Sequence, residues 1–278
     1  MNSLISYFEN IPSLHRAIII VGGISFFWVL EGLVPLFYFK YKKWRHALPN
    51  FFFTITTIII NFLLAFLLLS TSDWVVNNKF GFIHIFKDLP LVVEVIISIL
   101  LLDFIGAFLA HYVEHKFNPL WMIHLVHHSD HNVDTTTGNR HHPLESLIRF
   151  TFTLAAVFVV GAPIGYVMLY QSLSIVLTQF NHANIRLPKK IDKLLSYLIV
   201  SPDMHKIHHH YRLPYTDANY GNIFSIWDRL FGTYMYLDRE KIIYGVDVFP
   251  DEQKNSNIKE LLKQPFQKYQ RPTRSSEV

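Results

Sequence analysis

The sequence predicts an all-α integral membrane protein: a helical bundle with about three spanning helices plus a helical hairpin, and a cytosolic helical cap carrying a histidine cluster. Of its 278 residues, 51% are hydrophobic and 17% charged, and the mean hydropathy is +0.24. This composition excludes a disordered or fibrous chain. Uncharged runs long enough to cross a bilayer recur along the chain. Of the 16 histidines, 13 lie within residues 111–210, and cysteine is absent, which excludes disulfides and thiolate metal sites.

Three apolar runs predict the spanning helices. Residues 17–39 contain one charged residue, and residues 47–72 contain none. The third run, residues 91–110, contains two acidic residues and continues without a helix breaker into His111. Each run is close to or above the ~20 residues needed to cross the hydrocarbon core. We therefore expect the third helix to carry the first histidines to a membrane surface.

The distribution of basic residues predicts the orientation. The loop between the first two runs has four basic residues and no acid, whereas the next loop has two lysines balanced by two aspartates. The positive-inside rule places the first loop in the cytoplasm. Two further crossings bring His111 and the residues after it to the same side, with the N-terminus outside. The N-terminal residues lack a basic region and a cleavage site, so we expect no removable signal peptide.

Residues 150–185 predict a helical hairpin. This run of 36 residues has no charged side chain, and as one helix it would be ~54 Å long, too long for a ~30 Å core. Gly161, Pro163 and Gly165 break it near the middle. Because histidines lie on both sides of the run, we favour a hairpin with arms of about 11 and about 16 residues. The alternative is one crossing, with the later histidines on the opposite face of the membrane.

We expect a single membrane-embedded domain over residues 1–250. Its chemistry falls within about residues 90–240, where most histidines lie. Residues 251–278 are polar and contain two prolines, which predicts a weakly ordered C-terminal tail.

Eight histidines stand at helical spacing in the segments HYVEH, HLVHH and HKIHH. Residues three and four apart share one face of a helix, so two of these segments each present three imidazoles together. The eight are His111, His115, His124, His127, His128, His205, His208 and His209. One ion takes about four to six ligands, so two metal ions are implied. Imidazole suits Fe, Zn, Cu and Ni, and the spacing does not choose among them.

Six further histidines are less informative. Three stand alone and are interpreted as hydrogen-bonded side chains near the membrane interface: His15, His46 and His84. Three lie beside the motifs, and we expect them to be supporting or bystander groups: His131, His141 and His210. His210 makes the last segment HKIHHH, but His209 is the one that lies four residues after His205.

The order of these segments gives the chain a family resemblance. HYVEH, HLVHH and HKIHH occur together with RHHPLE at residues 140–145, QFNHANI at 179–185 and NYGNIFSIWDRLFGTY at 219–234. Over about residues 90–240 the chain resembles the sterol desaturase and fatty acid hydroxylase superfamily. The resemblance implies two iron ions at the cytosolic membrane surface, with zinc as a substitute in purified protein. It also implies a reaction in which O2 hydroxylates or desaturates a membrane lipid.

The same resemblance extends the ligand set to ten histidines. His142, from the His-Pro-Leu-Glu element, and His182, at the exit of the predicted hairpin, match the ninth and tenth positions. A ligating imidazole usually donates its other N–H to a carboxylate or carbonyl. Asp103 lies on the i+4 ridge of His111 and would be costly in an apolar helix if unpaired, so we expect it in the second shell. Asn222 and Asp228 match the family signature and are the other second-shell candidates. Further acidic candidates are Glu114, Asp130, Asp134 and Asp203.

The partners follow from this chemistry. The chain has no GxGxxG after a strand, no cysteine for a cluster and no haem-binding segment. We therefore expect an external electron donor, a reductase with a cytochrome or ferredoxin. Residues 186–212 carry six basic side chains, which would contact anionic headgroups or, as the less favoured alternative, an acidic electron carrier. No nucleic acid is expected, and the oligomeric state is left open.

Two other classes compete with a lipid oxygenase. A histidine-rich metal-transport or metal-binding membrane protein predicts ionisable residues facing one another inside the spans, but most of these histidines lie beyond the helix ends. A carboxylate di-iron protein requires Glu-x-x-His pairs, and the sequence has none. The lipid, the carbon oxidised, and the choice among hydroxylation, desaturation and ether cleavage stay open at this point.

Overall fold

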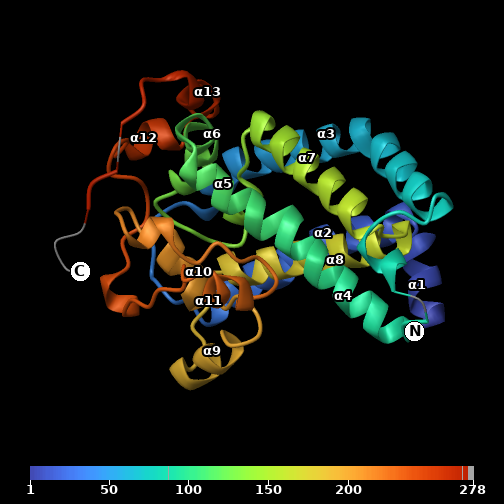
Figure 1. The fold of residues 1–278 in the computed structure, drawn as a ribbon. Helices are drawn as coiled ribbons and strands as arrows, with labels where there is room; N and C mark the ends of the chain where they lie inside the picture. Colours follow the sequence, from blue (N-terminus) through green and yellow to red (C-terminus); the bar gives the residue numbers. More distant parts are fainter. Residues whose placement is uncertain (87, 271, 275–278) are drawn as a thin grey trace.

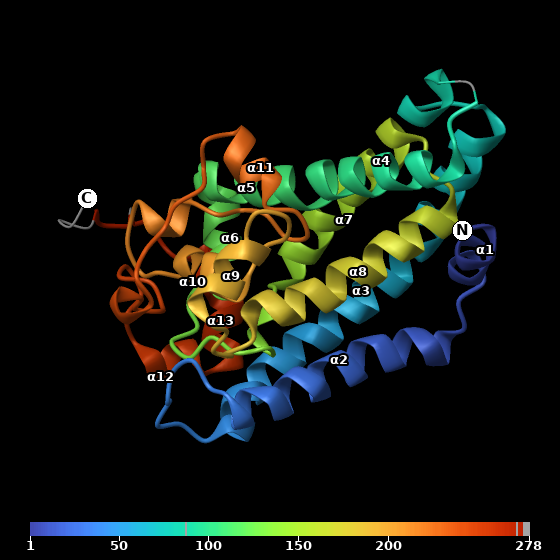
Figure 2. The ribbon, with the colours of Figure 1, turned by 90° about the horizontal axis from the view of Figure 1, so that it is seen from below.

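The computed structural model describes residues 1–86, 88–270 and 272–274, and over these residues it is helical with a few isolated β-bridges. Long helices run side by side, and short helices gather at one end of the bundle, which we call the cap (Figures 1 and 2). The N-terminal helix α1 (Asn2–Glu9) lies at the opposite end. The predicted all-helical membrane architecture is confirmed.

Four helical segments are long and apolar enough to cross a membrane: Ser13–Leu33, Lys43–Ile85, Leu91–Lys116 and Pro143–Val160. The first is α2, and the second contains the 35-residue α3 (Lys43–Asn77). The third joins α4 (Leu91–Asp103), a π-helical segment η2 (Phe104–Leu109) and α5 (Ala110–Lys116). Large apolar side chains such as Phe62 and Phe66 point outward from α3, as expected for a surface that faces lipid.

The predicted hairpin is present, and the alternative of a single crossing is wrong. Helix α7 (Pro143–Val160) ends at Gly161, which has a φ of 80°, and α8 (Ile164–His182) begins directly after Pro163. The arms are 18 and 19 residues long, longer than expected. The first arm begins at Pro143 because His142 caps the helix and proline suits its first position. Its charged residues Glu145 and Arg149 pair with each other at 3.0 Å.

The bundle core lies between α3, α4, α7 and α8. Leu102, Val157 and Val167 are fully buried there. Burial of these side chains against one another fixes the hairpin to the neighbouring helices. The hairpin therefore returns the chain to the cap end, where α8 finishes at His182.

The cap consists of short helices, and the histidine segments HLVHH and HKIHH fold as two of them, as the spacing predicts. Its helices are α6 (Asn118–His128), α9 (Lys189–Leu195), α10 (Pro202–His208), α11 (Ile226–Leu230), α12 (Glu252–Asn255) and α13 (Ile258–Lys263). The 3₁₀ turns are η1 (Phe82–Ile85), η3 (Thr137–Asn139), η4 (Tyr215–Asp217), η5 (Arg239–Lys241) and η6 (Gln264–Phe266). Ser201 caps α10 by accepting the Met204 N–H.

The start of the C-terminal tail is better ordered than expected. Asp251 and Asn257 cap α12 and α13 with their side chains. Leu261 is 1% exposed and packs with Phe53 and Val126. One buried leucine and two capped helix starts give this polar segment enough contacts to dock. Residues 271 and 275–278 of the predicted tail lie outside the described residues.

Gly161 offers a test of the hairpin turn. A Cβ at this position would lie 2.3 Å from the Phe80 carbonyl oxygen, in addition to the positive φ. We expect Gly161→Ala to lower the free energy of unfolding by about 3 kcal/mol, combining left-handed strain with a steric clash.

The matched control is Gly232→Ala, which has a φ of 69° but no atom within 4 Å of the added methyl. It should cost only about 1–2 kcal/mol. Thermal unfolding in detergent measures both, and equal shifts would contradict the close approach at the turn.

Candidate metal centre

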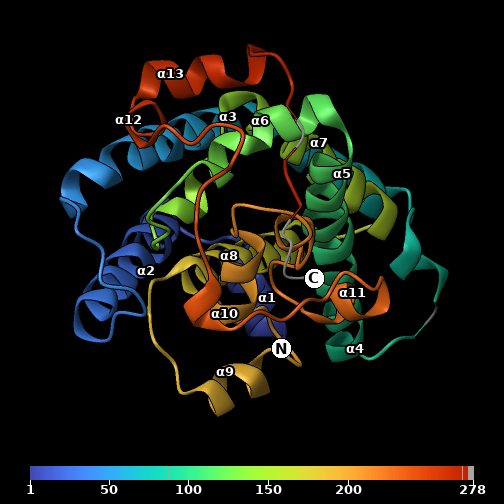
Figure 3. The same ribbon diagram turned by 90° about the vertical axis from the view of Figure 1, so that its left-hand side faces the viewer.

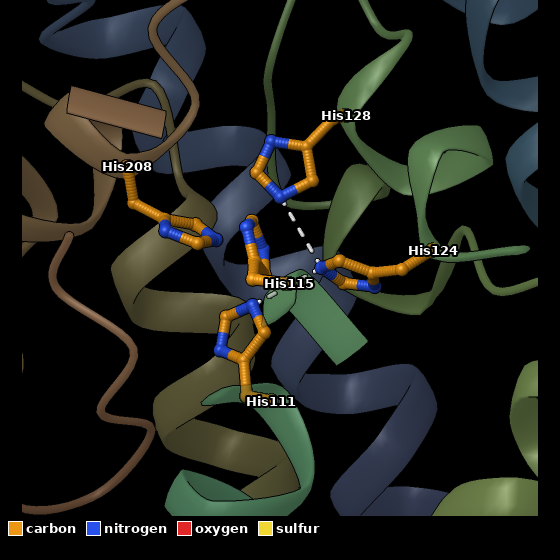
Figure 4. Close-up of side chains that lie close together, drawn as sticks. All are labelled: His111, His115, His124, His128 and His208. Carbon is orange, nitrogen blue, oxygen red and sulfur yellow. Dashed lines mark hydrogen bonds between the residues drawn. The ribbon is translucent and has the colours of Figure 1, made fainter. Parts of the chain in front are cut away.

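Nine histidines converge in two buried groups at the junction of bundle and cap. In each group one ring nitrogen per residue lies within 4.8 Å of the others. The first group contains His111, His115, His124, His128 and His208. The second contains His127, His182, His205 and His209. Figure 4 shows the rings of the first group pointing toward a common centre. The structure therefore brings together nine of the ten predicted ligands.

Each histidine triplet divides between the two groups. On α6, His124 and His128 belong to the first group, and His127 belongs to the second. On α10 and its C-terminal end, His208 points to the first group, whereas His205 and His209 point to the second. The i, i+4 pairs stay together because they share one face of the helix, while the remaining histidine lies toward the next face. The two groups are therefore neighbours that share both helices.

Carboxylates orient two rings of the first group. The Nδ1 of His124 is 2.7 Å from Glu145 Oε1, and the Nδ1 of His115 is 3.2 Å from Asp217 Oδ1. Burial raises the pKa of Asp217, but its bonds to His115 and Lys116 outweigh this effect and hold the pKa below its ordinary value. Each carboxylate accepts the outer N–H, which leaves the inner Nε2 lone pair facing the centre.

Backbone carbonyls orient two more rings. The Nδ1 of His111 donates to the Tyr220 carbonyl at 2.8 Å, and the Nδ1 of His208 donates to the Ala218 carbonyl at 2.7 Å. The inner Nε2 of His208 is buried and makes no hydrogen bond, and the same is true of His115. A buried unpaired ring nitrogen is costly unless it binds a cation, so these atoms fit a metal site.

The second group centres on His182. Its Nε2 lies 3.2 Å from the Nε2 of His127, 3.0 Å from that of His205 and 3.2 Å from that of His209. The Nδ1 of His182 donates to the Thr178 carbonyl at 2.8 Å, so its Nε2 carries a lone pair. Four ring nitrogens at these distances fit a shared cation.

The rings of the cap are held neutral, as metal binding requires. Burial lowers the pKa of His124 to about 3, although Glu145 acts in the opposite direction. Burial and the neighbouring histidines hold the pKa of His128, His208 and His209 well below the ordinary value. Five and four neutral imidazoles suit two transition-metal ions, and this donor set by itself does not select the metal.

The structure does not bring His142 to either group. Its Nδ1 accepts the N–H of Leu144, so it caps α7, and its Nε2 donates to the Leu262 carbonyl at 3.3 Å. The adjacent His141 lies closer to the centre: its Nδ1 is 2.6 Å from Glu145 Oε1, and its ring stacks on that of His127 at 4.8 Å. Pro143 starts the helix directly after His142, which explains why this ring is used as a cap.

Asp103 has different partners from those expected. It accepts the backbone N–H groups of Ile223 and Phe224 at 3.2 Å and the indole N–H of Trp227 at 3.0 Å. The reason is the π-helical segment η2, which follows Asp103 and precedes His111. A π-helix closes its hydrogen bonds one residue later than an α-helix, so the i+4 ridge assumed from the sequence is interrupted. Asp103 therefore holds a loop and contacts no histidine ring.

The other two second-shell candidates hold the same loop. Asp228 accepts the N–H groups of Tyr220 and Gly221, both at 2.8 Å. The Asn222 side-chain oxygen accepts the Thr178 hydroxyl at 2.8 Å. These contacts fix the loop whose Tyr220 carbonyl accepts the hydrogen bond from His111. The two candidates therefore support the centre indirectly, through this loop.

Glu145 and Asp217 were missed as direct partners of histidines. Glu145 stands in the RHHPLE segment four residues after His141, a spacing that could have indicated it. Asp217 is 102 residues from its partner His115, and no local pattern signals the contact. Of the remaining acidic candidates, Glu114 pairs with Arg149 and also lies 3.8 Å from the Nδ1 of His124, as a supporting group would. The others pair away from the two groups: Asp130 and Asp134 with His46, and Asp203 with Arg239.

His46 is hydrogen-bonded, as the sequence predicts, but its partners are two buried aspartates of the cap. It is nearly buried, with Nε2 2.8 Å from Asp130 and Nδ1 3.2 Å from Asp134. The two aspartates lie in a loop that folds over the start of α3, which sequence position cannot show. The other lone histidines keep ordinary bonds, His15 with the Tyr7 hydroxyl and His84 with the Gly161 carbonyl.

His131 and His210 lie outside both groups. The Asn255 amide is 3.2 Å from His131 Nε2, and the Ile243 N–H donates to His210 Nδ1 at 3.2 Å. Both rings are therefore used in packing loops of the cap.

The similarity to known proteins lies in the region of the chain that contains the nine histidines. Residues 95–233 match the model of the family described as fatty acid hydroxylase. Ornithine lipid hydroxylase OlsE of Rhizobium tropici is 25% identical over 146 residues, 52% of this chain and 43% of that protein. Alkylglycerol monooxygenase of Xenopus tropicalis is 30% identical over 145 residues, 51% of this chain and 30% of that protein. The human alkylglycerol monooxygenase is 26% identical over 144 residues, with the same coverage.

The matched region thus spans less than half the length of these relatives. No solved structure matches the chain.

Glu145 provides a test of the outer bonds. Glu145→Gln removes the charge that holds His124, and we expect metal affinity to fall by about 10–100-fold, as for other partners of ligating histidines. Metal content after competition with a chelator measures this directly. Glu240→Gln, on the exposed surface, is the control and should retain its metal. Equal retention in both variants would contradict the role of Glu145.

Proposed function

The chain belongs to the fatty acid hydroxylase family, and from that membership we propose that it oxidises a membrane lipid with O2 at a histidine-bound di-iron centre. The observation that carries this proposal is the convergence of nine buried imidazoles in two adjacent groups. Two groups of five and four rings correspond to two ions. Iron is the metal that the family implies, and zinc is the expected substitute in purified protein.

The substrate proposed is an amphiphilic lipid. One relative is named for an ornithine lipid and another for alkylglycerol. Both names denote oxygen insertion, as hydroxylase or monooxygenase, so we favour oxygen insertion over desaturation. A lipid could keep its tail in the bilayer while one carbon reaches the centre, because α5 and α8 lead from the hydrocarbon region to the histidines.

The chain's own residues prepare the site in two ways. Iron bound there would supply the O2-activating chemistry. Glu145, Asp217 and the carbonyls of Tyr220 and Ala218 accept the outer N–H groups of four rings of the first group and turn their inner lone pairs toward the ion. Burial of the nine rings excludes water, which would otherwise compete for the ions and quench a reactive oxidant. Electrons would come from a separate reductase with a cytochrome or ferredoxin.

We propose that the centre faces the cytoplasm. The basic loop between α2 and α3 lies at the cap end: the Tyr41 hydroxyl donates to Asp134 at 2.9 Å, and the Leu36 N–H donates to the Asn184 carbonyl at 3.0 Å. The loop that the positive-inside rule assigns to the cytoplasm is therefore on the same side as the histidines.

Metal and lipid analysis test the proposed reaction. We expect the purified protein to hold about two iron ions per chain, and cells that express it to contain an oxygenated lipid whose formation requires O2. One loosely held zinc ion per chain and an unchanged lipid profile would instead favour a metal-binding or metal-transport protein.

Single variants distinguish the role of the nine grouped histidines from that of His142. His209→Ala removes a ligand of the second group, and we expect loss of about half the iron and loss of the lipid product. His142→Ala removes only a helix cap, so both ions and the product should remain, with stability lowered by about 1 kcal/mol. Loss of iron in His142→Ala would restore it as the tenth ligand.

The orientation can be tested by labelling, since the chain has no cysteine. Tyr38→Cys places a thiol in the basic loop, and Asn78→Cys places one at the other end of α3. In sealed vesicles with the cytoplasmic face inside, an impermeant maleimide should label Asn78→Cys at once and Tyr38→Cys only after permeabilisation. The reverse pattern would contradict a cytoplasmic centre.

A further inference from the structure

Helix α9 is amphipathic, but it buries its polar side and exposes its apolar side, the opposite of a helix on a water-exposed surface. Its inward side is polar: Asp192 and Ser196 are both 4% exposed, and Asp192 accepts the Ser201 hydroxyl at 2.6 Å. Its outward side is apolar, with Leu194 69% exposed and Leu198, just beyond the helix, 74% exposed. A helix bordered by water would bury its apolar side instead.

The apolar side chains continue from α9 onto α11 and form one surface. We call this surface the α9–α11 rim; it consists of Ile191, Leu194, Leu198, Ile226, Leu230 and Phe231, all exposed. The two helices are joined: Arg229 donates to the Ser196 carbonyl at 2.8 Å, and its guanidinium lies over the Tyr197 ring. The rim is therefore held together by contacts between the two helices of the cap.

The rim packs against the third span at one end. The ring of Phe231 lies 5.4 Å from those of Phe104 and Phe108. Both partners belong to the candidate span Leu91–Lys116. Figure 3, which looks onto the cap end, shows α9 at the margin, outside the group of long helices. The rim therefore extends sideways from the bundle over the area that surrounding lipid would occupy.

Basic side chains accompany the rim. Lys189, Lys190 and Lys193 are exposed on α9, while its one acidic residue, Asp192, is buried. Glu240 lies 3.5 Å from Lys189, but both side chains are mostly exposed, so this pair is weak. The other three basic residues of residues 186–212 are engaged elsewhere. Lys206 donates to the Ala183 carbonyl, Arg186 donates to that of Leu36, and the Arg212 guanidinium lies over the Tyr211 ring.

We propose that the α9–α11 rim is inserted into the headgroup layer of the bilayer that holds the spans, with the lysines of α9 bound to anionic lipid phosphates. Exposed aliphatic side chains beside lysines are the pattern of an interfacial helix. A soluble acidic electron carrier could pair with the lysines. It could not also cover the end of the rim where Phe231 packs against the third span. The inference requires a membrane protein but does not depend on the lipid-oxidising reaction.

Spin labelling of the full chain tests the insertion. The absence of cysteine allows single labels at Leu194→Cys and Leu198→Cys, with Lys254→Cys in α12 as the water-exposed control. The protein is reconstituted in an equal mixture of phosphatidylcholine and phosphatidylglycerol. We expect both rim labels to collide several-fold more often with O2 than with a water-soluble nickel complex, and the control label to show the opposite preference.

Three outcomes would overturn the proposal. Rim labels that collide mainly with the nickel complex would mean that the rim lies in water. Labels protected only after an electron carrier is added would assign the rim to a protein partner. Spin–spin broadening that disappears on dilution with unlabelled protein would assign it to a second copy of the chain.

A charge reversal tests the lysines separately. Lys190→Glu with Lys193→Glu should shift the rim labels toward the nickel complex in the anionic mixture and leave them unchanged in pure phosphatidylcholine. Lys254→Glu with Lys263→Glu, in α12 and α13, is the matched control and should have no effect in either bilayer. Equal shifts in the two bilayers would overturn the assignment of the lysines to anionic lipid.

Discussion

The burial of nine imidazole rings at one point is the constraint on which the rest of the structure depends. Their inner nitrogens lie close enough to repel one another unless a cation lies among them. A buried donor without a partner is costly, and five of the rings have an acceptor for the outer N–H group: His111, His115, His124, His182 and His208. Helices α5, α6, α8 and α10 therefore have to meet at one end of the bundle, and each must arrive with its ring already oriented.

The acceptors come from parts of the chain that are far apart in sequence. Glu145 lies at the start of α7, Asp217 lies in η4, and Tyr220 contributes only its carbonyl. The loop that carries Tyr220 is held by Asp103 from the third span and by Asp228 from the cap. The loop therefore connects bundle and cap, and its displacement would disturb the orientation of the His111 ring.

The hairpin and the α9–α11 rim relate this centre to the bilayer. The hairpin returns the chain to the cap end, which lets His182 join rings from α6 and α10. The rim, if inserted as proposed, would fix the height of the cap above the lipid. The proposed reaction needs such a fixed height, because the headgroup of a lipid substrate would be held at the bilayer surface while the reacting carbon reached the two histidine groups.

The sequence by itself determined the helices, the hairpin and eight of the nine rings by spacing, because helical periodicity and helix breakers act over a few residues; His182 came from the family resemblance. Only the tertiary structure decided how His127 and His128 divide between the groups, and that His141 lies closer to them than His142. It also gave Asp103 loop partners instead of a histidine, since the π-helical segment changes which residues share a face. These outcomes depend on packing between distant segments, which local patterns cannot encode.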